Sequence, residues 1–138
     1  MTTLIQQRSD NDCVLASIAM AVGAGKWEDV WTDEDLQSAI DSQGISDYEP
    51  WLKRVGLVNY EDYRVVYTHT GASDTHVLLW GRRALLSVRS LNNDGGYHMV
   101  YFDGEKLHDP QEGVEGKLAY RFLHSCQIAR AILLKGAK

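Results

Sequence analysis

The sequence predicts an α+β fold in which N-terminal helices pack on a C-terminal antiparallel sheet. Apolar residues recur at helical spacing in roughly the first two-fifths of the chain. Short alternating runs separated by turn residues follow, including an Asp103-Gly104 pair typical of a β-hairpin. Helices first and strands afterwards favour this class. The 138 residues suit one domain, 1–138, with one core.

Three helices are expected in the first part of the chain. Residues 13–22 are apolar nearly all round, which predicts a helix buried on most sides. Thr32 offers a hydroxyl cap for a second helix, which Gly44 ends. Ser46 and Glu49 form the capping-box pattern of a third helix.

The second part of the chain predicts mostly strands. They are expected at residues 64–67, 84–91, 97–102, 105–109 and 127–134. Residues 118–124 are expected to form a short helix, and residues 76–80 are ambiguous between helix and strand.

Composition and charge exclude several classes of partner. The net charge is −5 and no Lys/Arg run is present, which argues against nucleic acid and anionic membranes as partners. Two cysteines are not a disulfide framework and indicate a reducing compartment, the cytoplasm. The apolar run 14–24 has the length of a signal-peptide core, but Asp10 and Asp12 precede it where basic residues are expected. It is too short to span a bilayer.

Cys13 stands where a polar loop meets the first apolar run, and it is the candidate nucleophile. A thiol at a helix N-terminus lies in a field that favours the thiolate. The alternative is a small apolar residue at the start of a core helix. Cys126 is expected to be such a core thiol.

The hairpin predicts a partner for Cys13. A two-residue turn at Asp103-Gly104 pairs Phe102 with Glu105, and continued pairing places His98 opposite Asp109. An Asp–His hydrogen bond there would fix the imidazole tautomer and leave the other ring nitrogen for a thiol.

The same pairing argues against a metal site. The chain has five histidines, but His108 should face the opposite side of the sheet from His98. The two rings therefore cannot share one zinc ion. No metal and no cofactor are expected.

Gln7 lies six residues before Cys13, across a polar loop. Its side-chain amide could donate to the oxyanion of a tetrahedral intermediate together with the Cys13 backbone N–H. Gln6 is the alternative donor, and both could instead be solvated loop residues. The loop 92–96, just before His98, either forms a rim of the cleft or only connects two strands.

Taken together, Gln7, Cys13, His98 and Asp109 resemble the order of catalytic residues in papain-like cysteine peptidases. Within that superfamily the chain is most similar to the bacteriocin-processing peptidase domains, which cut leader peptides after double glycine. The stretches QRSDNDCVLASIAMA and GGYHMVYFDGEKLHDP carry the resemblance, and Pro110 follows the Asp as in that family. The resemblance implies a papain-like fold with Cys13 as nucleophile, His98 as general base and acid, Asp109 as orienting residue and Gln7 as oxyanion donor.

We therefore expect a cysteine peptidase-like hydrolase that cleaves an amide bond of a peptide or protein through an acyl-enzyme. Two alternatives stay open. One is a deamidase or acyl transferase that uses the same residues. The other is a binding module on the same fold, without catalysis.

Overall fold

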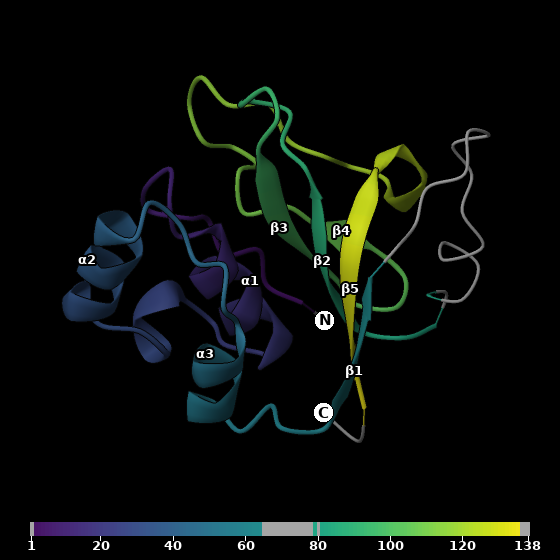
Figure 1. Ribbon diagram of the computed structural model, residues 1–138, viewed down its shortest axis with the longest axis horizontal. Coiled ribbons are helices and arrows are strands. Elements are labelled where there is room, and N and C mark those ends of the chain that lie inside the picture. The colour runs from purple at the N-terminus through teal and green to yellow at the C-terminus, as the bar shows by residue number, and fades with distance from the viewer. Residues whose placement is uncertain (1, 65–78, 80, 136–138) are drawn as a thin grey trace.

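The computed structural model describes residues 2–64, 79 and 81–135, and in these residues three α-helices lie on one face of a five-stranded antiparallel sheet (Figure 1). The helices are α1 (Cys13–Ala21), α2 (Asp33–Asp41) and α3 (Glu49–Arg54). The strands are β1 (Tyr60–Arg64), β2 (Ala84–Arg89), β3 (Tyr97–Phe102), β4 (Leu107–His108) and β5 (Ile128–Leu134), and two 3₁₀ turns are η1 (Trp27–Asp29) and η2 (Leu123–Ser125). The predicted α+β class and order of elements are confirmed.

The strand order is β1-β5-β2-β3-β4, so the last strand of the chain lies between the first two. Apolar side chains pack on both faces of the sheet. On the helical face, Leu15 and Ile18 of α1 pack with Met99 of β3. On the other face, Leu86 and Phe102 pack with the segment that follows the hairpin.

Helix α1 begins at Cys13, as the sequence predicts. Every residue of the helix after Cys13 is buried. Gly23 follows the helix with a φ of 77°, a conformation that glycine adopts without steric cost. The Ser17 hydroxyl of α1 donates to the Met99 carbonyl at 3.1 Å, which fixes the helix on β3.

The caps of the other two helices differ. The Thr32 hydroxyl accepts from the Asp35 N–H at 3.3 Å, and the Asp35 carboxylate accepts from the Thr32 N–H, so α2 begins as predicted. The predicted capping box of Ser46 and Glu49 is wrong, because α3 begins at Glu49 and its N-cap residue, Tyr48, makes no side-chain cap. Pro in the first turn already removes one of the N–H groups that a cap would satisfy.

Four of the predicted strands are found, the one at 105–109 shortened to Leu107–His108, and two other elements are corrected. The first strand covers Tyr60–Arg64 rather than 64–67, and residues 65–78 and 80 lie outside the described residues. The predicted helix at 118–124 reduces to the turn η2. The Leu118 and Tyr120 N–H groups donate to the side chains of Asn92 and Asp109, and residues 117–122 have no regular secondary structure.

The predicted register of the hairpin is wrong by two residues. Phe102 pairs with Leu107 instead of Glu105, and the turn is centred on Gly104 and Glu105. The cause is the Asp103 side chain, whose Oδ1 accepts from the N–H groups of Glu105 and Lys106 at 2.9 and 2.8 Å. The shift is even, so each side chain keeps its predicted face.

Within the described ranges, no helix combines the length and the apolar character needed to cross a bilayer.

Candidate active site

Cys13 lies at the N-terminal end of α1, against the start of β3. The Met99 N–H donates to its Sγ at 3.5 Å. Asp12 is the N-cap residue but makes no side-chain bond to the helix, so its charge does not cap the first turn. The sulfur therefore lies in the positive field of the helix N-terminus and also accepts an N–H from the sheet.

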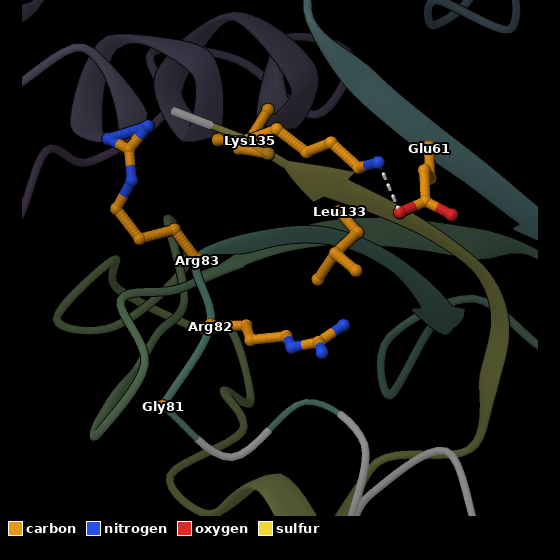
Figure 2. Close-up of a pocket in the computed structure, with 7 residues that line it drawn as sticks. Glu61, Gly81, Arg82, Arg83, Leu133 and Lys135 are labelled. Atoms are coloured by element: carbon orange, nitrogen blue, oxygen red, sulfur yellow. Dashed lines mark ion pairs between the residues drawn. The ribbon is translucent and has the colours of Figure 1, made fainter. Parts of the chain in front are cut away.

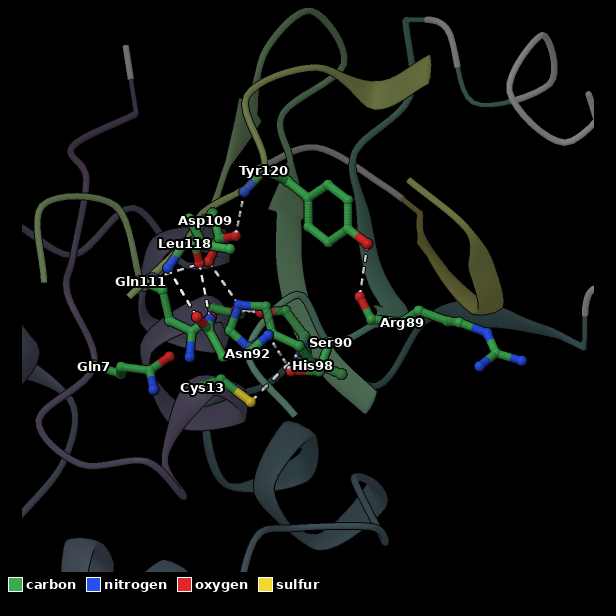
Figure 3. A network of polar contacts seen from close by, with 12 residues as sticks. Gln7, Cys13, Arg89, Ser90, Asn92, His98, Asp109, Gln111, Leu118 and Tyr120 are labelled. Atoms are coloured by element: carbon green, nitrogen blue, oxygen red, sulfur yellow. Dashed lines mark hydrogen bonds and ion pairs between the residues drawn. The ribbon is translucent and has the colours of Figure 1, made fainter. Parts of the chain in front are cut away.

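His98 and Asp109 are in contact, as the sequence predicts. The His98 Nε2 lies 2.6 Å from the Asp109 Oδ1, and both side chains are buried (Figure 3). In the observed register the residue opposite Asp109 is Val100, so the contact is diagonal rather than direct. It forms because β4 ends at His108 and the chain then turns away from the ladder.

The Asp109 carboxylate is held by backbone donors. Its Oδ1 accepts from the Gln111 N–H and its Oδ2 from the Tyr120 N–H, both at 2.8 Å. Neither Lys nor Arg pairs with it among the described residues. His98 is therefore the charged group that can balance this buried carboxylate.

His98 bridges the carboxylate and the thiol. Burial lowers the pKa of His98, but the hydrogen bonds and the electrostatic interactions with Asp109 and Cys13 outweigh burial and raise the pKa to about 9. Because Nε2 bonds to Asp109, Nδ1 is the ring nitrogen left for Cys13. The arrangement favours an imidazolium at neutral pH.

Asn92 connects the loop before His98 to the segment that holds Asp109. Its side chain donates to the Leu118 carbonyl at 2.9 Å and accepts from the Leu118 N–H at 2.8 Å. It also donates to the Gln111 side-chain oxygen at 2.8 Å. No sequence pattern predicts these bonds of Asn92, because a single Asn in a polar loop is ordinary.

Gln7 is buried, and its side chain points toward Cys13 (Figure 3). Its backbone N–H donates to the Pro110 carbonyl at 3.0 Å, which ties the N-terminal segment to the residue after Asp109. One N–H of its amide donates to the Ser9 carbonyl at 2.7 Å, and a primary amide has a second N–H to offer. Gln6 instead extends along the exposed surface to the Glu112 carbonyl.

The loop between Gln7 and Cys13 is shaped by the buried carboxylate of Asp12. This group accepts from the N–H groups of Arg8 and Ser9 and from the Ser9 hydroxyl. It also accepts from the Trp27 indole N–H at 3.1 Å. An acid just before a helix is expected to cap it, so the sequence could not show that Asp12 orders the preceding loop instead.

An open hollow of about 960 Å³ exposes the Cys13 side chain. One wall comes from the stretch between α2 and α3, and the other from strands β1, β5, β2 and β3. Asn93 and Gly96 also line it, so the loop 92–96 forms a rim of this hollow. A second hollow of about 480 Å³, lined by Arg82 and Lys135, lies at the opposite end of β2 and β5 (Figure 2).

The other two residues considered in the sequence, His108 and Cys126, lie outside this site. His108 pairs with Tyr101, stacks on its ring and contacts Asp103 at 2.8 Å, so it faces away from His98 as predicted. Burial and the Asp109 charge raise the pKa of Cys126 to about 12. Among the described residues, no three His, Cys, Asp or Glu side chains are grouped to hold a metal ion.

No protein-family model, curated protein or solved structure matches the chain. The chemistry available to the site follows from the geometry of Cys13, His98 and Asp109. The thiol, the imidazole and the carboxylate lie next to one another in that order, which is the arrangement needed to activate a nucleophile.

Proposed function

We propose that the chain is a cysteine-dependent hydrolase that cleaves an amide bond of a peptide or protein. The observation that carries the proposal is the buried His98 ring, which contacts Asp109 through Nε2 and Cys13 on its other side. The helix that begins at Cys13 and packs on an antiparallel sheet supports a papain-like fold. A reducing compartment such as the cytoplasm would keep the thiol active.

The proposed reaction uses these groups in turn. The Cys13 Sγ attacks the scissile carbonyl carbon, and the oxyanion accepts from the Cys13 backbone N–H and the second amide N–H of Gln7. His98 gives its proton to the leaving amine as the C–N bond breaks. Water then attacks the thioester while His98 takes a proton from it, which releases the acid and restores the thiol.

Selective alkylation tests the nucleophile. Iodoacetamide at neutral pH, followed by intact mass and peptide mapping, should modify Cys13 at least tenfold faster than Cys126, whose thiol is buried and has a pKa of about 12. Equal rates in the folded protein would contradict the proposal. A peptide-library digest with Cys13→Ala as the blank tests amide cleavage, and Cys126→Ala is the matched control.

The two adjacent glutamines test the oxyanion donor. Gln7→Ala should lower kcat by about 10²–10³-fold, because it removes a donor to the tetrahedral intermediate. Gln6→Ala should leave kcat nearly unchanged, since its amide bonds only to the exposed Glu112 carbonyl. The reverse order would move the donor role to Gln6.

A further inference from the structure

A row of side chains leads across the sheet away from Cys13. Met99, whose N–H touches the Cys13 sulfur, pairs with Ser87 of β2. Ser87 pairs with Arg130 of β5, which in turn pairs with Arg64 of β1. Directly paired residues share a face, so the row lies on the helical side of the sheet, where Met99 packs.

This row forms one wall of the hollow that exposes Cys13. All of its members line that hollow, opposite the stretch Ser42–Ser46 and Tyr48. Three strand spacings of about 4.8 Å separate Met99 from Arg64, which gives roughly 14 Å. An extended peptide advances about 3.3–3.6 Å per residue, so roughly four residues cover this distance.

The two arginines differ in what they can bind. The Arg130 guanidinium is paired with Asp62, with Nε at 2.8 Å from Oδ1, and lies over the Tyr48 ring at 4.6 Å. Arg64 is exposed and forms no ion pair with another described residue. Asp10, at the Cys13 end of the hollow, is paired with Lys117. Among the described residues that line the hollow, Arg64 is thus a cation without an ion pair, in a chain whose net charge is −5.

We propose that Arg64 binds a carboxylate of the peptide substrate about four residues from the scissile amide, an inference that rests on the proposed function. The carboxylate belongs either to an Asp or Glu side chain or to the end of the substrate chain. A guanidinium offers a planar fork of N–H donors that matches both oxygens of this group. Arg130, on the neighbouring strand, stays paired with Asp62, so the substrate carboxylate is bound by Arg64.

The test uses matched peptides and an exposed variant. Fluorogenic peptides carry Asp or Asn at each position two to six residues from the cleaved bond, on either side, and a second set ends in a free or an amidated terminus. Wild type should prefer one acidic position, and Arg64→Gln should lower kcat/KM for that peptide about three- to tenfold while leaving its Asn partner unchanged. Arg64→Glu should reverse the preference. Arg82→Gln, in the other hollow, is the control.

Binding separates this proposal from the proposed hydrolysis. The same peptides are titrated against Cys13→Ala by fluorescence anisotropy, with and without Arg64→Gln. An acid preference that Arg64→Gln abolishes supports the subsite even where wild type cleaves nothing, and in that case the hydrolase proposal alone fails. Cleavage or binding that is indifferent to the acid, or no binding at all, overturns the subsite. Preference for the free terminus alone identifies the carboxylate as the end of the substrate.

Discussion

At the scale of single residues, His98 contacts both Asp109 and Cys13. Its ring lies between the buried Asp109 carboxylate and the Cys13 thiol, and the ring itself is buried. Charges held in a low-dielectric site interact strongly, which is why the ring stays protonated far above the ordinary pKa of histidine. The protonation of His98 should therefore set the alkaline limit of both activity and stability.

The first prediction concerns pH. The His98 pKa is raised from 6.5 to about 9, so kcat/KM should fall with an alkaline limb near pH 9 as the imidazolium is lost. The folded state binds this proton more tightly than the unfolded state. Its contribution to the free energy of unfolding is therefore complete below pH 6.5 and disappears as pH rises through 9.

The measurement is a pH–rate profile with a substrate that does not titrate between pH 6 and 10, together with urea unfolding at several pH values. A variant without the carboxylate, Asp109→Ala, is the comparison, and its limb should move to lower pH. An alkaline limb already near the ordinary histidine value in the wild type would contradict the ion pair.

The second prediction concerns Asp109→Asn. Both carboxylate oxygens accept N–H groups, from His98 and Gln111 on one side and from Tyr120 on the other. An amide offers only one oxygen, so its NH₂ group must face a buried N–H. Asp109→Asn should therefore lower kcat by about 10²–10⁴-fold, as strongly as Asp109→Ala.

Thermal melting provides the second readout for this variant. Asp109→Asn should also lower the melting temperature, because a buried donor left without a partner costs roughly 1–3 kcal/mol. A stable and active Asp109→Asn protein would show that the two backbone donors do not hold the carboxylate.

The sequence predicted the thiol, the ring beside it and the carboxylate that contacts the ring, but not the residues that order the loops around them. Cys13, His98 and Asp109 follow from a helix start and a hairpin, both of which are local patterns. Asp12 and Asn92 act on neighbours whose positions depend on the whole chain. Their side chains satisfy backbone groups of loops, and nothing in loop composition indicates which groups these will be.

At the scale of elements, the hairpin shows how one side chain can change a register. Asp-Gly is a strong signal for the centre of a two-residue turn. Here Asp103 takes the position before the centre, because its carboxylate accepts two N–H groups of the turn and also contacts His108. Gly104, with a φ of 104°, becomes the first central residue. Strand existence and face were predictable, whereas the register depended on this side-chain bond.

Asn92 gives the third prediction, which concerns the link between two loops. Asn92→Ala removes the bonds to Leu118 and Gln111 and loosens the segment whose N–H groups hold Asp109. The kcat should fall by roughly ten- to hundredfold, since a displacement of the orienting group misaligns the catalytic residues.

If Asn92 positions Asp109, its replacement should change the pH profile as well as the rate. The alkaline limb of Asn92→Ala should shift to lower pH, because a looser Asp109 holds the His98 proton less well. Asn92→Asp, which still accepts from the Leu118 N–H, should recover part of the activity. Gln37→Ala, an exposed amide on α2, is the control. An unchanged pH profile would show that Asn92 supports the fold without positioning Asp109.

At the scale of the whole molecule, the site lies where the helical layer meets the sheet. Cys13 comes from the helices, and His98 and Asp109 come from the sheet and the segment after it. The Ser17 hydroxyl bonds to the Met99 carbonyl, and the Arg83 guanidinium bonds to the Ala21 carbonyl at 3.1 Å. These contacts join α1 to the sheet along its length, so the geometry of Cys13, His98 and Asp109 depends on the two layers staying together.

The last prediction follows from this junction. Leu15 lies in the core between α1 and the sheet, and Leu86 lies in the core on the opposite face, both fully buried. Because the two cores share the sheet, Leu15→Ala and Leu86→Ala should each lower the free energy of unfolding by about 2–5 kcal/mol within one cooperative transition.

Tryptophan fluorescence, which reports the helical layer through Trp27 and Trp31, and far-UV circular dichroism should give coincident urea curves. Val58→Ala, at a side chain that is 69% exposed, should leave the midpoint unchanged. Two separate transitions, one shifted by Leu15→Ala and the other by Leu86→Ala, would show that the helices and the sheet unfold as independent units, and the single-domain prediction would be wrong.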